Sequence, residues 1–260
     1  MKKIFLTAVV LAAALTGLWA QTPDGREIMR LVEDSTKSKS SAMDMTMLLV
    51  DVNGSSGERR LQILTFKDEN DLIRTITVFK SPPSVENTRF LTVENKGRAD
   101  DQWIYLPALK KIKRIASGEK EGNFMGSDFS YADMESRDLD DDIHTLLREE
   151  NFSGTVCWVV QTVPKPDTDG TYAKTVSWID KEKKIPLKVE YYKDSAKPAS
   201  KILINENLQY IQGRWTIQKT TMTDLGSGHK TVLTVNQVKY DLTVNPAYFT
   251  TNYLQTGRTQ

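Results

Sequence analysis

From residue 43 onward, apolar and polar residues alternate with a period of two over most of the chain. Turn-forming pairs such as Asn53-Gly54 and Gln212-Gly213 separate the alternating stretches. Because successive side chains of a β-strand point to opposite faces, this pattern predicts about a dozen antiparallel strands joined by hairpins. A sheet with so many strands must curl or close on itself. The predicted strands cover residues 43–49, 59–67, 72–80, 88–94, 102–106, 110–116, 144–149, 155–163, 172–180, 187–193, 201–210, 215–224 and 230–241.

Helical signals occur near the two ends of the chain and at one place in its middle. Ile28, Leu31 and Val32 recur at helical spacing after Thr22, which is expected to cap the helix, and Pro23, which fits its first turn. A helix this short needs an apolar surface to lie on. Further short helices are expected near residues 131–139 and 246–254.

The composition excludes several classes of protein. With 35 Lys and Arg against 34 Asp and Glu, the formal net charge is +1, which argues against a nucleic-acid binder. One cysteine excludes an intramolecular disulfide framework, and two histidines leave little material for a metal centre. We therefore expect no cofactor and no metal. Cys157 lies in an apolar run and is expected to be buried, whereas His229 lies in a glycine-rich turn and is expected to be exposed.

Residues 1–20 have the pattern of an export signal. Lys2 and Lys3 precede an apolar run, and cleavage is expected after Ala20. The run is too short to cross a hydrocarbon core of about 30 Å. No cysteine near the cut offers a site for lipidation. We expect residues 21–260 to form a single soluble domain outside the cytoplasm.

Two strands carry candidate binding residues. Met43, Met45 and Met47 share one face of the first strand, and methionine adapts well to irregular apolar ligands, although an ordinary core is the alternative. In the strand 110–116, basic and apolar residues alternate, which indicates a solvated strand or attraction to anionic lipid heads or to an acidic partner. This basic edge comprises Lys110, Lys111, Lys113 and Arg114.

Catalytic signals are weak. The chain has no Gly-x-Ser-x-Gly, His-Glu-x-x-His or Cys-x-x-Cys motif and no phosphate-binding loop. His144 follows an acidic run, residues 138–142, and candidate nucleophiles are Ser127, Ser130 and Ser136. The acidic run also offers oxygen ligands for Ca²⁺, but it lacks the ligand spacing of an EF-hand. The alternative is that His144 begins a strand beside a solvated acidic loop.

The segment 101–134 resembles one known family. It reads Asp-Gln-Trp-Ile-Tyr-Leu-Pro-Ala-Leu, then a basic strand, and then Gly-Asn-Phe-Met-Gly-Ser-Asp-Phe-Ser-Tyr-Ala-Asp-Met over residues 122–134. This combination is similar to the outer-membrane lipoprotein-sorting proteins of the LolA-like family, in particular to the broader branch associated with lipid exporters. The resemblance extends more loosely over nearly all of residues 21–260.

The resemblance implies an incomplete, strongly curved antiparallel β-barrel with helices as a lid over an apolar cavity. It implies a periplasmic carrier, not an enzyme, that binds acyl chains of lipoproteins or lipids and moves them toward the outer membrane. Expected partners are an inner-membrane transporter, an outer-membrane acceptor and, transiently, a membrane. We expect the cavity to be lined by Met43, Met45, Met47, Ile28, Leu31, Val32, Trp103 and Tyr105.

Two other functions stay open at this stage. One is a lipid-acting hydrolase of the phospholipase kind, assisted by Ca²⁺ at the acidic run, that uses the same cavity. The other is a structural β module of an envelope complex.

The glycine-punctuated segment 117–134 carries Phe124, Met125 and Phe129, which are costly to expose in a surface loop. One interpretation is a gate that folds over the cavity mouth and moves as cargo enters or leaves. The other is a plug that extends the core at one end of the curled sheet. Both interpretations place Phe124 and Phe129 inside the molecule.

Overall fold

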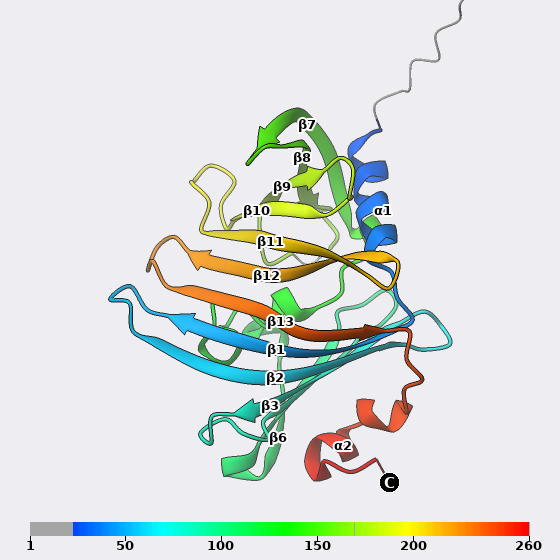
Figure 1. Cartoon of the computed structure of the whole chain (residues 1–260), viewed down its shortest axis with the longest axis vertical. Coiled ribbons are helices and arrows are strands. Elements are labelled where there is room, and N and C mark those ends of the chain that lie inside the picture. Colours follow the sequence, from blue (N-terminus) through cyan, green and yellow to red (C-terminus); the bar gives the residue numbers. More distant parts are fainter. Residues whose placement is uncertain (1–22, 169, 260) are drawn as a thin grey trace, which may run out of the picture.

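The computed structural model describes residues 23–168 and 170–259, so the predicted export signal lies outside the described residues. Within these described residues, thirteen strands form one antiparallel sheet in the order β6-β5-β4-β3-β2-β1-β13-β12-β11-β10-β9-β8-β7. The sheet curls strongly but does not close, and β6 and β7 are its two edges (Figure 1). The expectation of an incomplete, curved antiparallel barrel is confirmed.

The elements follow the alternation in the sequence closely, with ends that shift by a few residues. The strands are β1 (Ser40–Val50), β2 (Ser56–Lys67), β3 (Ile73–Ser81), β4 (Arg89–Val93), β5 (Asp101–Leu106), β6 (Lys111–Arg114), β7 (Asp142–Phe152), β8 (Thr155–Pro164), β9 (Lys174–Asp180), β10 (Pro186–Tyr192), β11 (Lys201–Ile211), β12 (Arg214–Asp224) and β13 (Lys230–Tyr240). The α-helices are α1 (Gly25–Thr36) and α2 (Thr251–Thr256).

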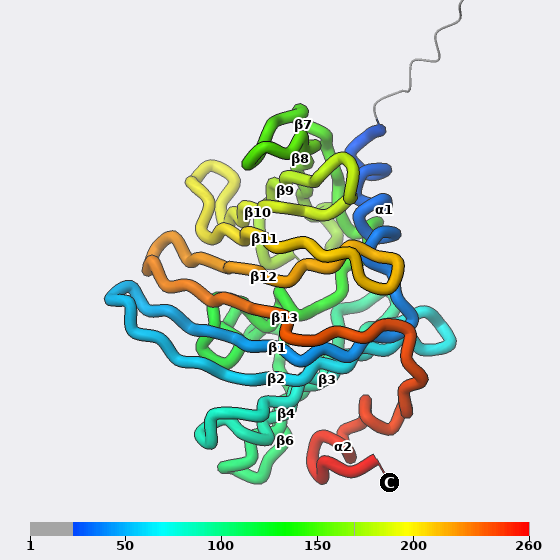
Figure 2. The backbone as a smooth tube through the Cα atoms, viewed as in Figure 1, coloured from blue at the N-terminus to red at the C-terminus, as the bar shows by residue number. Residues whose placement is uncertain are grey.

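Consecutive strands pair as hairpins throughout, except β6 and β7, which lie at opposite edges of the sheet. The segment that joins them, residues 115–141, must therefore cross the concave face; we call it the strap. In Figure 2 the strap is the green chain that passes behind the middle strands. The helix expected at 131–139 is absent from it: only the short turns Ala132–Met134 and Leu139–Asp141 form there. Ser130 and Asp133 hydrogen-bond each other's backbone N–H groups, which favours a turn over a helix.

The strand register shows which side chains share the concave face. Met45 lies opposite Leu61, and Leu61 lies opposite Phe79, so these three form a row across β1, β2 and β3. Phe90 and Ile104 continue the same face on β4 and β5. All five side chains belong to one buried cluster, to which the strap contributes Ile115 and Phe124.

Helix α1 covers a different part of the concave face, over β7, β8 and β9. Its N-cap is Asp24, whose carboxylate accepts a hydrogen bond from Glu27 N at 2.8 Å, so the prediction of a cap at Thr22 is wrong. Gly25 permits the close approach to β7, because a Cβ there would lie 2.6 Å from the backbone carbonyl of His144. The helix is held by Ile28, which is fully buried.

The last segment of the chain covers the convex face. The 3₁₀ turn Pro246–Phe249 and helix α2 pack over β3 to β6, with Phe249 and Leu254 buried. Arg89 fixes this segment by donating a hydrogen bond to the Leu254 carbonyl at 2.7 Å. This closing helix was expected, but it does not act as a lid because it lies outside the barrel. None of the helices in the described part of the chain is long and apolar enough to cross a membrane.

Candidate functional site

The strap is seated on the concave face by a cluster of rings. Phe124 is only 3% exposed, and its ring centroid lies 4.9 Å from that of Phe90, 6.0 Å from Phe79 and 5.6 Å from Tyr131. Aromatic pairs at these separations add stability beyond the area they bury. This part of the concave face is therefore filled by the protein itself.

A buried polar network fixes the strap to the opposite wall. Asp128, at 4% exposure, accepts hydrogen bonds from Thr231 Oγ1 at 2.6 Å and donates its own N–H to the same oxygen at 2.8 Å. Nδ1 of His229 lies 2.8 Å from the Asp128 carboxylate, and Lys201 Nζ donates to the Asp128 carbonyl at 2.7 Å. Removing one partner from such a network leaves buried polar groups unpaired, which is costly. His229 was expected to be exposed, but its contact with the Asp128 carboxylate keeps its side chain partly buried.

A second polar contact holds the strap near β5. Ser136 N donates to the Asp100 carboxylate at 2.8 Å, and Lys120 Nζ donates to the Asp100 carbonyl at 2.9 Å while it also pairs with Glu135. Burial raises the pKa of Asp100 to about 6, because the carboxylate loses hydration, and the nearby negative charge of Glu135 acts in the same direction. Gln102 adds a hydrogen bond to the Tyr131 carbonyl at 2.8 Å.

A cavity of about 650 Å³ lies between the strap and strands β8 to β12. This volume falls within the range of ligand pockets in proteins. Its apolar wall comes from both sides, with Phe129 supplied by the strap and Tyr191, Leu203 and Met222 supplied by β10, β11 and β12. Those strand residues face inward together, since Leu203 lies opposite Met222 in the register.

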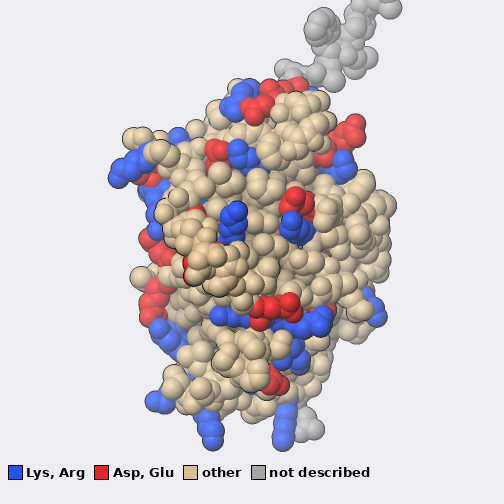
Figure 3. All heavy atoms as spheres, turned by 60° about the vertical axis from the view of Figure 1, so that its left-hand side comes forward, with Lys and Arg blue, Asp and Glu red and all other residues tan. Residues whose placement is uncertain are grey.

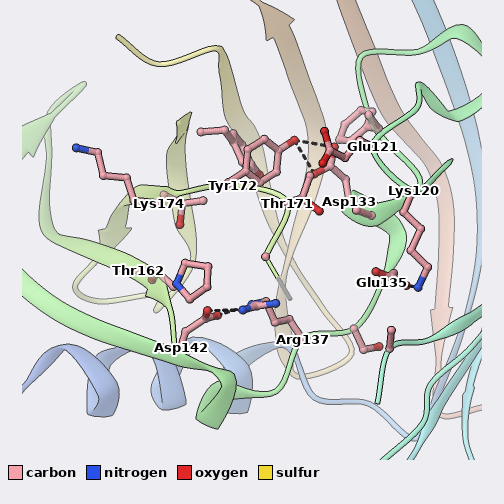
Figure 4. Close-up of a pocket in the computed structure, with 18 of the residues that line it drawn as sticks. Lys120, Glu121, Asp133, Glu135, Arg137, Asp142, Thr162, Thr171, Tyr172 and Lys174 are labelled. Atoms are coloured by element: carbon pink, nitrogen blue, oxygen red, sulfur yellow. Dashed lines mark hydrogen bonds and ion pairs between the residues drawn. The ribbon is translucent and has the colours of Figure 1, made fainter. Parts of the chain in front are cut away.

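Two pairs of polar side chains line the cavity and contact each other across its polar wall (Figure 4). Tyr172 donates a hydrogen bond to Asp133 at 3.0 Å, and Arg137 Nε donates to Asp142 at 2.6 Å. Burial, together with the Asp133 carboxylate, raises the pKa of Tyr172 well above its usual range. These pairs make one side of the cavity polar without leaving an open charge on any of these four side chains. The cavity is thus amphipathic, with an apolar wall and a polar, fixed wall.

A second hollow, of about 430 Å³, lies on the other flank of the strap, against β5 and β6. Its lining is mostly apolar and includes Ile104, Ile115 and Met125. An ion pair between Lys113 and Glu119, at 2.6 Å, stands at its border. The strap therefore runs along the concave face with one hollow on each side.

The three methionines of β1 lie on the concave face, as predicted, but the strap covers them. Met45 and Met47 are 8% and 2% exposed and pack in the same cluster as Phe124, with Met43 at the margin of that cluster. They do not line the cavity of about 650 Å³. The stripe is therefore core beneath the strap in this structure, and its contact with cargo stays a prediction.

Two predicted cavity residues lie on the wrong face. Trp103 and Tyr105 pack on the convex side, in the cluster formed by Phe249 and Leu254. Because side chains alternate along β5, Gln102 and Ile104 take the inward positions. The prediction that Trp103 and Tyr105 line the cavity is therefore wrong.

The helix residues lie inside the barrel but far from the methionines along the sheet. Ile28, Leu31 and Val32 pack on Trp158 and Ile179 of β8 and β9 in a cluster of their own. They do not line the cavity of about 650 Å³, so the expectation that they and the methionines line one cavity is wrong. Strand β1 follows α1 in sequence, but the chain passes from one side of the sheet to its middle between them.

The basic edge divides into two parts. Lys113 pairs with Glu119, and Arg114 pairs with Asp101, so both serve ion pairs within the fold. Hydrogen bonds from Arg98 and Arg114 hold the pKa of Asp101 well below its usual range. Lys110 and Lys111 are exposed at the tip of the β5–β6 hairpin.

The residues needed for hydrolysis are not brought together. His144 places Nδ1 2.9 Å from Thr162 Oγ1 and Nε2 3.1 Å from the Leu139 carbonyl, so both ring nitrogens are engaged without a serine. Two acids of the run form ion pairs, Asp140 with Arg26 at 2.7 Å and Asp142 with Arg137 at 2.6 Å. Within the described residues, His, Cys, Asp and Glu side chains nowhere gather in threes to hold a metal ion.

The sequence analysis missed the residues that build the cavity and the polar network. Tyr191, Leu203 and Met222 come from three strands, and each is an ordinary inward residue of an alternating stretch. Lys201 and Thr231 carry a weak signal, because each is a polar residue at an inward position near the start of a strand. Only the strand order reveals that these positions meet the strap.

Comparisons with known proteins agree with this architecture. A family model described only as "uncharacterized protein" matches residues 71–256, which is more than half of the chain. No curated protein matches the chain. Several solved structures do, over most of their length.

The first of these is a domain from Vibrio parahaemolyticus named for outer membrane lipoprotein sorting, with 33% identity, a TM-score of 0.82, and coverage of 89% of this chain and 98% of that one. A DUF1329 family protein from Desulfovibrio piger has 27% identity and a TM-score of 0.85 over the same shares, 89% and 98%. A LolA superfamily protein from Nitrosomonas europaea shares the fold, with 21% identity, a TM-score of 0.70, and coverage of 89% and 100%. The chain therefore belongs to the family that is named for outer membrane lipoprotein sorting, and it shares the fold of the LolA superfamily.

Proposed function

We propose that this protein is a carrier that binds the acyl chains of a lipid or a lipidated protein on the concave face of its sheet. The observation that carries the proposal is the cavity of about 650 Å³ beside the strap, with an apolar wall of Phe129, Tyr191 and Leu203. Burial of each CH₂ group of a ligand contributes about 0.8 kcal/mol, so a chain of moderate length binds without any specific polar contact. A carrier needs no catalytic residues. The ring of His144 contacts Thr162 and the Leu139 carbonyl, not a serine.

We base the proposed location and partners on the family, not on the cavity. We propose that residues 1–20 direct export and that the remaining chain works in the periplasm. The similarity to a domain named for lipoprotein sorting supports a cargo with acyl chains. An inner-membrane transporter would load such a carrier, and an outer-membrane acceptor would receive its cargo.

Titration of the purified protein with a fluorescent fatty acid tests the proposal. We expect saturable binding that Leu203→Glu weakens at least about tenfold, because the variant places a charge against the acyl chain. Ile202→Glu is the matched control, since Ile202 is the adjacent residue on the opposite face of β11. Absence of saturable binding, or equal losses in both variants, would contradict the proposed site.

Native mass spectrometry of protein purified from its own envelope then identifies the cargo. A bound mass of a lipid and a bound mass of a lipidated protein are readily distinguished. Purified protein that carries neither a lipid nor a lipidated protein would favour the interpretation as a structural module of an envelope complex.

Hydrolysis is tested in parallel by incubation with phospholipid vesicles and assay of free fatty acid. We expect no turnover, because the ring nitrogens of His144 contact Thr162 and the Leu139 carbonyl. Turnover that disappears in His144→Ala would show that the protein is an enzyme.

A further inference from the structure

Three hairpin tips at one end of the sheet expose large aliphatic side chains. Antiparallel pairing brings the β1–β2, β5–β6 and β12–β13 turns to the same end, and we call these three turns the rim. Val52 is 74% exposed, Leu109 is 62% exposed and Leu225 is 46% exposed. Two of the tips touch, because a Cβ on Gly228 would lie 3.5 Å from Val52 Cγ2. Val156, at 52%, and Tyr210, at 64%, are exposed at the opposite end, so the apolar tips matter only together with the charges beside them.

The charges beside these tips favour an anionic surface. Lys110 and Lys111 directly follow Leu109, and Lys230 follows the turn that holds Leu225; all three lysines are exposed. The acidic residues of the tips are used within the turns, since Asp51 accepts from Val52 N at 2.7 Å and Asp224 accepts from Ser227 N at 2.7 Å. Figure 3 turns this side of the molecule forward, and basic side chains project from its lower border.

The cavity lies toward the same end of the sheet. Tyr191 is near the end of β10, Leu203 is near the start of β11, and Met222 is near the end of β12, all of which run to or from the rim end. The β8–β9 connection, which contributes Tyr172, also lies at this end. A surface that touches the rim would therefore face the cavity rather than the back of the barrel.

The geometry points to a docking function for the rim: Val52, Leu109 and Leu225 enter the interfacial layer of an anionic lipid membrane while Lys110 and Lys111 bind its headgroups. This inference rests on the proposed carrier function and adds the surface through which cargo is exchanged. Shallow insertion of aliphatic tips combined with basic residues gives weak, reversible membrane binding. Reversibility suits a carrier, which must leave the membrane after each exchange.

Flotation with vesicles tests the docking surface. We expect the protein to bind vesicles of phosphatidylcholine with phosphatidylglycerol, and the double variant Val52→Ser, Leu109→Ser to bind at least about tenfold more weakly. Lys110→Ser with Lys111→Ser should weaken binding and reduce its salt dependence. Tyr210→Ser is the matched control, because Tyr210 is 64% exposed at the opposite end of the sheet.

The outcomes separate this inference from the carrier function. Fatty-acid binding is measured in solution without vesicles, and we expect the rim variants to retain it. Wild-type protein that takes fatty acid but does not float with the vesicles overturns the docking inference alone. Equal flotation of the wild type and the Val52, Leu109 double variant also overturns it.

Discussion

Replacement of Phe124 by alanine separates the two interpretations of the strap. The side chain is 3% exposed and touches the rings of Phe79, Phe90 and Tyr131. Removing a buried phenylalanine costs about 3–5 kcal/mol, because the transfer free energy is lost and a cavity remains. For a chain of this size, each kcal/mol lowers the melting temperature by about 2–4 °C. A plug therefore predicts a fall of about 10 °C.

Thermal unfolding followed by circular dichroism measures this loss. Phe124→Leu is the conservative comparison, and we expect it to retain most of the stability because it keeps most of the buried volume. Met125→Ala is a second comparison, since the neighbouring side chain is only partly buried and should cost less. The reasoning is refuted if Phe124→Ala melts within about 2 °C of the wild type.

Hydrogen exchange adds the dynamic part of the same experiment. A gate would change the protection of backbone amides across residues 117–134 when lipid binds, whereas a plug would not. The buried contacts of Phe124 and Asp128 favour a strap that is held firmly in the empty protein. Motion of the strap stays a prediction until this exchange is measured.

Three further outcomes follow from the structure. Gly25→Ala should lower the free energy of unfolding by about 1–3 kcal/mol, because its Cβ would lie 2.6 Å from the His144 carbonyl. Gly118→Ala is the control, because a Cβ at that position meets no atom within 4 Å. Burial raises the pKa of Asp100 from 3.8 to about 6, so the folded state binds this proton more tightly, and stability falls by about 2 kcal/mol as pH rises from 4 to 6. Urea unfolding of Asp100→Asn should show a smaller change over that window. The side chain of Cys157 is fully buried, and burial raises the pKa of its thiol to about 11. Labelling of this thiol should therefore proceed only as fast as the protein unfolds, and rapid labelling of the native protein would contradict this.

The alternation in the sequence predicted the strands well, but it did not tell which face of each strand is inside. On β5, Ile104 faces the strap while Trp103 and Tyr105 face the C-terminal segment. Both faces are covered, so both carry apolar residues, and the pattern alone has no polar side to mark as outside. The error over Trp103 and Tyr105 follows from this double coverage.

Long-range pairing limited the prediction of the site in another way. Asp128 meets Thr231 across 103 positions in the sequence, and it meets Lys201 across 73. None of these residues is unusual by itself. Their meeting depends on the pairing of β13 with β1, which places the first and last strands in the middle of the sheet. That pairing determines the strand order, and it is not visible in the local sequence.

The polar network gives the strap a second role, in setting cargo affinity. The strap covers the methionine face, so a cargo larger than the cavity of about 650 Å³ must displace it and break the contacts of Asp128. Affinity is then reduced by the fraction of molecules in which the strap is open. Thr231→Val removes both hydrogen bonds to Asp128 and should lower stability by about 1–3 kcal/mol while it tightens binding of a long-chain lipid. Binding of a short fatty acid that fits the cavity should change little. A variant that is less stable and also binds the long-chain lipid more weakly would show that the strap supports the binding site instead of competing with the cargo.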